Sequence, residues 1–289
     1  MGGGDTAGVT QRLPIALTIA GSDSGGGAGI QADLKTFAAF GVYAASVVTA
    51  LTAQNTRGVR TVHTPPSAVV GAQIDAVLGD FAVGAIKIGM LGSAEIAGVV
   101  AERLSAQLAH EHRLLADSAS AFIVYDPVMI ASSGDALSGA GFVEAVRHTL
   151  LPLVDCLTPN LAEAAGLLSE PVARSEADMA RQGKALLKLG PRAVLMKGGH
   201  LDGDEAVDLL MTEDTIRRFA APRVASKNLH GTGCTLSSAV VAHIVLGVGL
   251  PEAVAAAKAF VRQAIERGQD VTLGRGAGPV IQMELRSKL

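Results

Sequence analysis

The sequence of 289 residues has little that suits a nucleic-acid, membrane or disulfide-stapled protein. Tryptophan is absent and aromatic residues make up only 3% of the chain, so a surface on which bases stack is not expected. The formal net charge of −3 gives no reason to expect nucleic acid or an anionic membrane as a partner. The longest apolar run, near Cys234, is too short for a membrane span and contains polar residues. The two cysteines, Cys156 and Cys234, do not have the CxxC spacing of a zinc site, and they do not indicate a disulfide scaffold.

What remains is the composition of an ordinary globular protein with a large core. Hydrophobic residues make up 49% of the chain and charged residues 18%, which allows a sizeable core to be buried. There is no internal repeat, low-complexity linker or break in composition. We therefore expect a flexible leader over residues 1–12 and one domain over residues 13–289. No secretory signal is evident, so we expect a cytoplasmic location.

Apolar, β-prone segments alternate along the chain with segments of helical spacing, which is typical of α/β proteins. We expect strands over residues 13–20, 46–51, 85–88, 122–125, 153–157 and 193–196, and a hairpin formed by 207–211 and 216–219. We expect helices over residues 31–40, 67–78, 93–108, 139–150, 176–189 and 251–269. Polar loops are expected over residues 54–59, 110–118 and 132–135.

The most informative stretch is Gly231-Thr232-Gly233-Cys234, which is followed by an apolar run over residues 236–246. It predicts a glycine-rich loop that opens a buried helix near Cys234. The unpaired N–H groups and the positive end of such a helix form a cradle for an anion, such as a transferring phosphoryl group. The thiolate of Cys234 should be favoured at a helix start, and it could accept a proton from a substrate hydroxyl. The alternative is a glycine turn before a core helix, with Cys234 as a small buried residue.

A second glycine-rich loop, over residues 21–29, follows the first expected strand and precedes a helix. This layout is typical of a ligand loop in an open parallel sheet. The sixth position of a dinucleotide fingerprint holds Ile30 instead of glycine, and no Gly-Lys-Ser/Thr follows, so both a dinucleotide site and a P-loop are disfavoured. Asp33 is expected in the first turn of the helix, where its simplest role is to interact with the helix dipole.

Polar side chains follow several of the expected strands, where α/β sheets bind ligands. The amide of Gln54 can donate and accept together, which suits the edge of a heterocycle, although a solvated loop residue would look the same. Met90 either lines a flat ligand or packs in the core. Asp126 ends a strand, and Lys197, followed by two glycines, suits contact with phosphate oxygens.

Asn160 and Glu163 stand three residues apart at an expected helix start. This spacing is that of a capping box, which is a purely structural feature. The same oxygen atoms could also organise hydrated Mg²⁺ near phosphates. The two roles are compatible, and the spacing alone does not choose between them.

Taken together, these segments resemble one family, the hydroxymethylpyrimidine/phosphomethylpyrimidine kinases of thiamine biosynthesis, within the ribokinase-like superfamily. The resemblance runs in order from about residue 13 to residue 279. The matching stretches are Ala20-Gly21-Ser22-Asp23 with residues 26–36, Thr49-Ala50-Leu51 with Gln54-Asn55-Thr56, Lys87-Ile88-Gly89-Met90-Leu91, Asp126-Pro127-Val128-Met129, Thr158-Pro159-Asn160 with Glu163, Lys197-Gly198-Gly199-His200 and His230-Gly231-Thr232-Gly233-Cys234-Thr235.

The resemblance implies a three-layer α/β/α sandwich with a central, mostly parallel sheet, and it implies ATP, Mg²⁺ and a homodimer. It assigns pyrimidine contacts to Gly21, Asp33, Gln54, Met90 and Val128. It assigns the anion hole and catalysis to Gly231, Gly233, Cys234 and Lys197, nucleotide contacts to Asp126, Asn160, Lys197 and Thr232, and the Mg²⁺ network, partly through water, to Asp126, Asn160 and Glu163. The chain departs from the family in having Ser24-Gly25 where Pro-Ser is common, and Ser132 where lysine is common.

The expected activity is the phosphorylation by ATP of 4-amino-5-hydroxymethyl-2-methylpyrimidine and then of its monophosphate to the diphosphate. A pyridoxal kinase of the same superfamily is the nearest alternative. A non-catalytic pyrimidine-binding regulatory protein is the alternative from another class. The phosphate-binding features around Lys197 and Cys234 argue against that last alternative, because simple binding does not require them.

Overall fold

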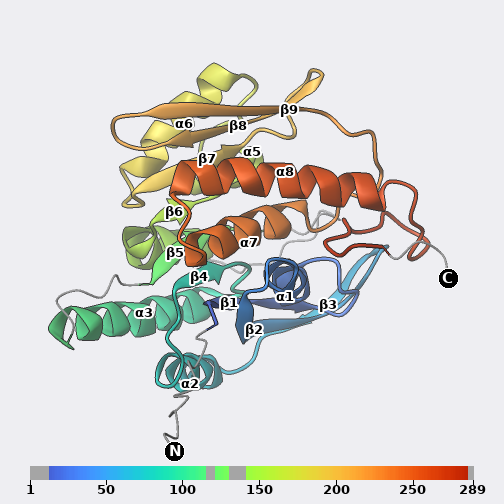
Figure 1. The fold of residues 1–289 in the computed structure, drawn as a ribbon. Coiled ribbons are helices and arrows are strands. Elements are labelled where there is room, and N and C mark those ends of the chain that lie inside the picture. The colour runs from blue at the N-terminus through green and yellow to red at the C-terminus, as the bar shows by residue number, and fades with distance from the viewer. Residues whose placement is uncertain (1–12, 115–120, 130–140, 286–289) are drawn as a thin grey trace, which may run out of the picture.

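The computed structural model of the protein describes residues 13–114, 121–129 and 141–285. Its centre is a nine-stranded sheet in the order β3-β2-β1-β4-β5-β6-β7-β8-β9 (Figure 1). Neighbouring strands from β2 to β7 pair in parallel, whereas β3, β8 and β9 add antiparallel strands at the two edges. The strands are β1 (Ile15–Asp23), β2 (Tyr43–Asn55), β3 (Gly58–His63), β4 (Ala85–Ile88), β5 (Phe122–Tyr125), β6 (Cys156–Leu157), β7 (Ala193–Lys197), β8 (Glu205–Met211) and β9 (Ile216–Pro222).

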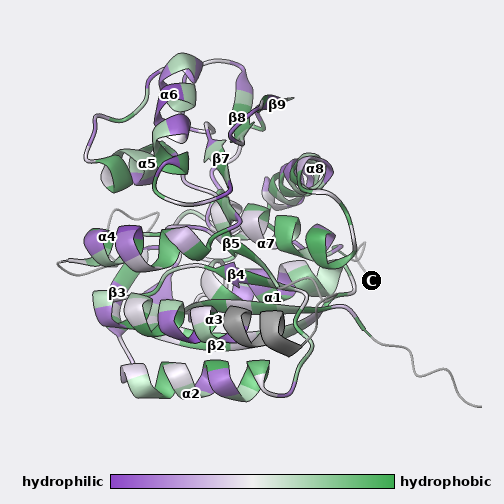
Figure 2. Ribbon diagram, turned by 90° about the vertical axis from the view of Figure 1, so that its left-hand side faces the viewer, coloured by the Kyte–Doolittle hydropathy of each residue, from purple (hydrophilic) through white to green (hydrophobic). Residues whose placement is uncertain are grey.

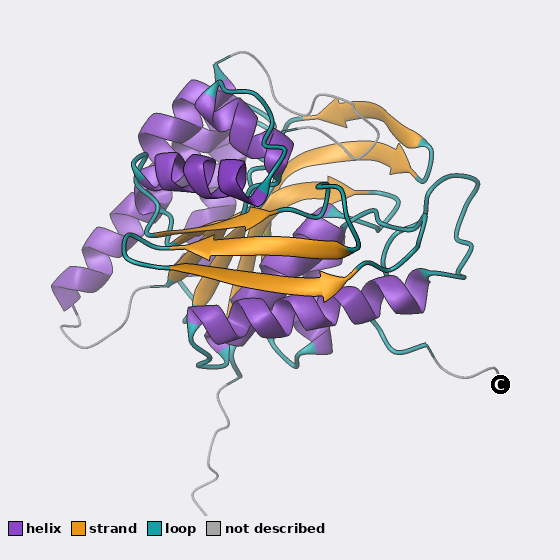
Figure 3. Cartoon of the chain, turned by 90° about the horizontal axis from the view of Figure 1, so that it is seen from above, coloured by secondary structure: helices purple, strands orange, loops and turns teal. Residues whose placement is uncertain are grey.

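Helices cover both faces of this sheet (Figure 3). They are α1 (Gly29–Ala39), α2 (Ser67–Leu78), α3 (Ala94–Leu114), α4 (Phe142–Ala145), α5 (Leu161–Leu168), α6 (Glu176–Leu187), α7 (Thr232–Val245) and α8 (Leu250–Gly268). A π turn over Val146–Leu150 and a 3-10 turn over Leu151–Leu153 follow α4. The covering helices, α2 and α6 for example, show both hydrophilic and hydrophobic residues (Figure 2).

The core has two parts because alternate residues of each strand face opposite sides of the sheet. Ile86 and Ile88 of β4 pack with residues of α2 to α6, whereas Ala85 of the same strand packs with residues of α1, α7 and α8. The expected three-layer α/β/α sandwich is therefore confirmed. Helix α7 lies between the sheet and α8, and every residue from Thr235 to Ala242 is buried.

Most expected elements are present, and the corrections concern short or polar segments. The stretch expected as a loop over residues 54–59 is the turn of a hairpin, in which β2 continues to Asn55 and β3 begins at Gly58. Helix α3 runs to Leu114, so the loop expected from residue 110 is wrong up to that point; polar residues extend an existing helix at little cost. The strand expected over 153–157 is reduced to Cys156–Leu157, because the 3-10 turn occupies residues 151–153. The 1–12 leader and the 132–135 loop lie outside the described residues.

Within the three described ranges, no helix has both the length and the apolar character that a membrane crossing requires.

Candidate active site

The candidate site lies at the carboxyl ends of the parallel strands. Asp23 ends β1, Gln54 lies near the end of β2, and Met90 follows β4. Asp126 follows β5 directly, and Lys197 ends β7. Because parallel strands present their carboxyl ends at one edge of the sheet, side chains far apart in the sequence meet there.

The glycine-rich loop over residues 231–234 forms the start of α7 as expected, and the helix begins two residues before Cys234. Gly231 is the residue before the helix and has a φ of 82°, which favours glycine. A Cβ atom on Gly231 would lie 1.9 Å from the carbonyl oxygen of Gly27, so the two glycine loops pack backbone against backbone. The N–H groups of Gly233 and Cys234 have no acceptor among the described residues, which leaves two donors for an anion.

Lys197, Asp126 and Glu163 form a charged cluster beside this helix start. Lys197 Nζ donates to Asp126 Oδ1 at 2.5 Å and lies 3.8 Å from Glu163 Oε2. A Cβ atom on Gly233 would lie 3.1 Å from Lys197 Nζ, so the helix start approaches the cluster closely. Burial raises the pKa of Glu163 to about 7; the Lys197 ammonium acts against this shift, and Asp126 adds to it.

Within this cluster, the hydrogen bonding of the Asp126 carboxylate is not complete. Its side chain is 1% exposed, and its Oδ2 atom has no hydrogen-bond partner in the described parts of the chain. A buried carboxylate oxygen without a partner is costly unless a ligand supplies one. No group of three or more His, Cys, Asp or Glu side chains in residues 13–114, 121–129 and 141–285 could hold a metal by itself. Mg²⁺ typically uses one or two carboxylates together with phosphate oxygens and water, so Asp126 and Glu163 fit that ion when phosphate is present.

Asn160 and Glu163 form a complete capping box at the start of α5, as the spacing predicted. Asn160 Oδ1 accepts from the Glu163 amide at 2.9 Å, and Glu163 Oε2 accepts from the Asn160 amide at 2.7 Å. The structural role is therefore confirmed. Glu163 Oε2 also faces Lys197, so the capping residue belongs to the charged cluster as well.

Cys234 lies at the helix start, but its thiol is not activated in the way the sequence suggested. Burial raises the pKa of Cys234 to about 11; the Lys87 ammonium and the Gly29 amide act against this shift, while the Asp33 and Asp126 carboxylates add to it. The expectation of a favoured thiolate is wrong for the ligand-free protein, because burial and two carboxylates outweigh the helix start.

Three of the expected pyrimidine contacts come together as an apolar surface. The sulfur of Met90 would lie 3.1 Å from a Cβ atom on Gly21, and the Gly21 amide donates to Met90 O at 3.0 Å. Met90 packs with Ala50, and Val128 packs against that pair. A flat ring could lie against this surface, and the lack of a side chain on Gly21 keeps it open.

Asp33 does not join that surface. It is the fifth residue of α1, outside the first turn, and it is fully buried. Its Oδ2 accepts from Lys87 Nζ at 2.9 Å and from Thr18 Oγ1 at 2.6 Å, and its Oδ1 accepts from Ser238 Oγ at 2.7 Å. Three protein donors thus bond its carboxylate in the ligand-free protein, and its contact with the pyrimidine stays a prediction.

Sequence reasoning assigned no role to Asp23 or His230, although both lie in the matched stretches. Asp23 Oδ2 accepts from the amides of Gly27 and Ala28 and lies 3.0 Å from His230 Nε2. The same His230 nitrogen lies 3.1 Å from Gln54 Nε2. Asp23 and His230 are 207 positions apart in the sequence, so no local pattern could have paired them.

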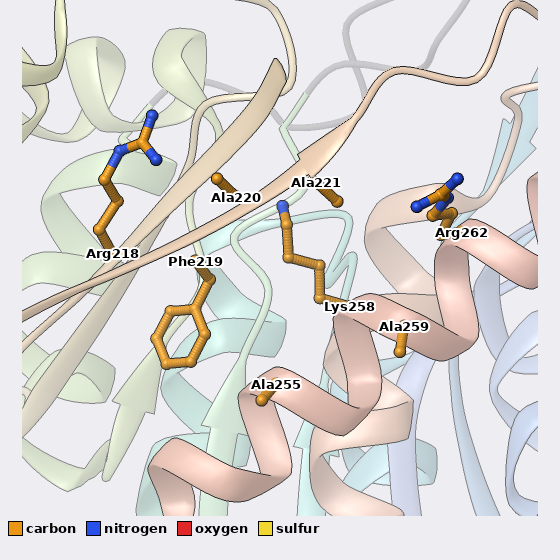
Figure 4. A pocket seen from close by; sticks show the side chains of 8 residues that line it. All are labelled: Arg218, Phe219, Ala220, Ala221, Ala255, Lys258, Ala259 and Arg262. Carbon is orange, nitrogen blue, oxygen red and sulfur yellow. The ribbon is translucent and has the colours of Figure 1, made fainter.

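A groove of about 360 Å³ elsewhere on the molecule includes none of the expected site residues (Figure 4). It is lined by Arg218, Phe219, Ala220 and Ala221 of β9 and by Ala255, Lys258, Ala259 and Arg262 of α8. Each of its cations is paired with a carboxylate: Arg218 with Glu176 and Glu205, Lys258 with Asp208, and Arg262 with Glu266. It is therefore not a ready-made site for an anion.

Comparison with known proteins agrees with this geometry. The model of the family described as phosphomethylpyrimidine kinase matches residues 23–281. The chain is 52% identical over 266 residues to the hydroxymethylpyrimidine/phosphomethylpyrimidine kinase of Rhizobium meliloti, covering 92% of this chain and 96% of that protein. The structure of phosphomethylpyrimidine kinase from Clostridium difficile 630 matches with a TM-score of 0.74 and 42% identity, over 88% of this chain and 100% of that chain. The ADP complex of Bacillus subtilis pyridoxal kinase matches with a TM-score of 0.82 and 32% identity, over 94% of this chain and 98% of that one.

Proposed function

Because the chain belongs to the phosphomethylpyrimidine kinase family, we propose that it transfers phosphate from ATP to 4-amino-5-hydroxymethyl-2-methylpyrimidine and then to the monophosphate, in thiamine biosynthesis. The observation that carries this proposal is that the amides of Gly233 and Cys234, which have no acceptor among the described residues, lie beside the Lys197–Asp126 pair. Phosphoryl transfer depends on positioning and on donors aimed at the developing charge, and this arrangement supplies both.

The apolar surface of Gly21, Met90 and Val128 holds one face of the pyrimidine, and Gln54 contacts its polar edge. The hydroxymethyl oxygen attacks the γ-phosphorus of ATP, the bond from that phosphorus to the leaving ADP oxygen breaks, and the hydroxyl proton leaves. Cys234 is the acceptor we propose for that proton. Since its thiol is protonated at neutral pH in the free protein, the thiolate is a minority species there.

The phosphates of ATP lie against the amides of Gly231, Gly233 and Cys234 at the start of α7, with Thr232 beside them. Lys197 neutralises charge on the transferred group. Mg²⁺, when bound, neutralises phosphate charge. Asp126 and Glu163 would hold it, with Asn160 in its water shell, and Asp126 Oδ2 has no hydrogen-bond partner within the described ranges.

Separate initial rates from the alcohol and from the monophosphate test the two steps. We expect product from both, with the monophosphate step more sensitive to ionic strength and to Mg²⁺, because its substrate brings two more negative charges into the site. Turnover of the alcohol without any diphosphate at every Mg²⁺ concentration would contradict the two-step proposal.

A pyridoxal kinase is the second candidate, favoured by the TM-score of 0.82 with the Bacillus subtilis enzyme. Steady-state rates with the pyrimidine alcohol and with pyridoxal separate the two. We expect kcat/KM to be higher for the pyrimidine, and the reverse order would favour the alternative.

We further propose that the enzyme is a cytoplasmic homodimer, on the strength of its resemblance to the family. Light scattering coupled to size-exclusion chromatography gives the mass directly. A single species near the mass of one chain, 29.3 kDa, would contradict the dimer.

A further inference from the structure

The two glycine loops are held together by one hydrogen-bonded group of side chains: Asp23, His230 and Gln54. The ring of His230 occupies the space above Gly27, where a Cβ atom would lie 2.5 Å from its Cδ2. The main chain of His230 is fixed by hydrogen bonds with Gly278 and Val280. His230, which directly precedes the anion-binding loop over residues 231–234, therefore connects that loop to the loop over residues 21–29.

Asp23 is the fixed acceptor of this group. Burial alone would raise the pKa of Asp23, but hydrogen bonds from His230 and from the amides of Ala28 and Gly25 hold that pKa below its ordinary value. An ionised carboxylate can only accept hydrogen bonds. The proton between Asp23 Oδ2 and His230 Nε2, which are 3.0 Å apart, therefore belongs to His230.

A proton on His230 Nε2 decides how the Gln54 amide is oriented. That nitrogen then has no lone pair for an amide N–H of Gln54, 3.1 Å away, so the amide oxygen must face it and share its one proton with Asp23. A half-turn of the amide exchanges its oxygen and nitrogen and places Oε1 against His230.

The other end of the amide favours the same orientation. Thr52 Oγ1 lies 3.0 Å from Ser22 O. It lies 3.2 Å from the terminal atom of the Gln54 amide that does not face His230. A hydroxyl has one hydrogen, and Ser22 O can only accept, so Thr52 can act only as an acceptor toward Gln54. The NH₂ group of Gln54 satisfies that requirement. His230 and Thr52 thus select the same orientation independently.

We propose that His230 is a positioning residue, whose Nε2 proton fixes the Gln54 amide with its oxygen toward His230 and thereby sets the heterocycle edge that the site accepts. This inference rests on the proposed function in taking Gln54 as the contact to the ring. A 4-aminopyrimidine presents a donor, its amino group, next to an acceptor, the adjacent ring nitrogen. An amide held in one orientation can pair with that donor and acceptor in only one arrangement. In pyridoxal, two oxygen substituents occupy the corresponding edge, and the fixed amide lacks a second donor for them.

The first measurement does not depend on activity. Long-range ¹H–¹⁵N correlation spectra of the protein labelled at histidine report which ring nitrogens carry a proton, and His230→Gln assigns the signal. We expect Nε2 of His230 to be protonated at neutral pH. A neutral ring protonated at Nδ1 alone would overturn the proposal, whether or not the protein proves to be a pyrimidine kinase.

The second measurement compares kcat/KM for the pyrimidine alcohol and for pyridoxal. His230→Phe keeps a ring above Gly27 but removes the donor, and we expect kcat/KM for the pyrimidine to fall about tenfold, mainly through KM, while that for pyridoxal changes less. His230→Gln keeps a donor and should restore part of the loss. His148→Phe is the matched control, since His148 also pairs with a carboxylate but is 70% exposed on the surface.

A double-mutant cycle with Gln54→Ala separates positioning from general support of the fold. If His230 acts through Gln54, His230→Phe should cause little further loss in the Gln54→Ala protein. Fully additive losses, or an unchanged ratio of the two substrates, would overturn the proposal. If His230→Phe does not fold, the same cycle is run with His230→Gln. Failure of the wild-type protein to phosphorylate the pyrimidine would reject the proposed function and leave the spectroscopic result to decide the role of His230.

Discussion

Lys87 with Asp33 and Lys197 with Asp126 form two buried ion pairs on the face of the sheet that α7 covers. In the first pair both side chains are fully buried, and both oxygens of Asp33 accept hydrogen bonds from the protein. In the second pair Lys197 is 11% exposed, and Asp126 Oδ2 has no partner among the residues described. One pair is closed by its own chain, and the other is left open to a ligand.

The difference arises from where each lysine lies in its strand. Lys87 lies inside β4 and faces Thr18 of β1 in register, with α1 and α7 packed above. Lys197 is the last residue of β7, at the carboxyl edge of the sheet. Its Nζ would lie 3.1 Å from a Cβ atom on Gly233, in the glycine loop that opens α7. Burial alone would lower the pKa of both lysines, but their carboxylate partners raise it above the ordinary value, so both stay charged. Position along the strand, more than the type of pair, decides whether the charge is available to a ligand.

The closed pair should dominate stability. Lys87→Met removes one charge and leaves Asp33 buried without its ion partner, so we expect the free energy of unfolding to fall by about 3–5 kcal/mol. Urea denaturation measures this loss. The double variant Lys87→Met/Asp33→Asn removes both charges and should recover a substantial part of it. A double variant as unstable as Lys87→Met would show that the ion pair itself is not what the core requires.

The open pair should dominate turnover. Lys197→Met removes the cation beside the anion-binding loop, and we expect kcat to fall by about 10²–10³-fold, the scale of one lost charge-stabilising group. We expect a smaller loss of stability than for Lys87→Met, because Glu163, with its pKa near 7, can take up a proton when the cation is removed. Lys184→Met, an exposed lysine of α6, is the control. Equal losses of stability at Lys87 and Lys197 would remove the distinction between the two pairs.

The sequence predicted both members of the open pair as site residues, although not their pairing, whereas it assigned no role to Lys87, and the reason is physical. Asp126 and Lys197 follow apolar strands, and a polar residue at a strand's carboxyl end is a recognisable pattern. Lys87 lies within the strand Ala85-Ile86-Lys87-Ile88, where only the tertiary structure reveals that the lysine is buried against α1. Asp33 was misplaced because the helix begins at Gly29, which moves it from the first turn to the buried face.

The same limit applies to the fold and to the rest of the site. The alternation of apolar strands and helices indicated an α/β protein, and the mostly parallel sheet was expected from the resemblance to the family. The short β6 and the polar β3 carry too little periodicity, and β3 was missed. The start of α7 was predicted from its glycines, whereas the raised pKa of Cys234 depends first on burial and then on carboxylates from α1 and from the residue after β5. Charge around a site is a property of several distant segments, which a local motif does not report.

Charges from both pairs act on the pKa of Cys234: Lys87 and Asp33 of the closed pair and Asp126 of the open pair. Substitution of Cys234 therefore concerns both pairs. We expect Cys234→Ala to lower kcat by roughly 10²-fold with little change in pyrimidine binding, if the thiolate is the base. Since the folded-state pKa is raised to about 11, the thiolate fraction increases with pH throughout the neutral and mildly alkaline range. The wild-type kcat/KM should therefore rise with pH above neutrality, and Cys234→Asp should recover part of the rate and lose that rise. Wild-type kcat in Cys234→Ala would show that another group accepts the proton.

The smallest expected effect concerns Glu163, which belongs both to the capping box and to the open pair. Glu163→Gln keeps the capping box, because glutamine can also accept from the Asn160 amide, so the free energy of unfolding should change little. The same change removes a carboxylate beside Asp126 and Lys197. We therefore expect the Mg²⁺ concentration for half-maximal rate to rise several-fold, with a smaller change in kcat at saturating Mg²⁺. Titration of the initial rate with Mg²⁺ at fixed ATP measures this shift, and Glu170→Gln, a half-buried carboxylate after α5 that pairs with Arg181, is the control. An unchanged Mg²⁺ requirement would restrict Glu163 to its structural role and leave Asp126 as the carboxylate that the open pair offers to the metal.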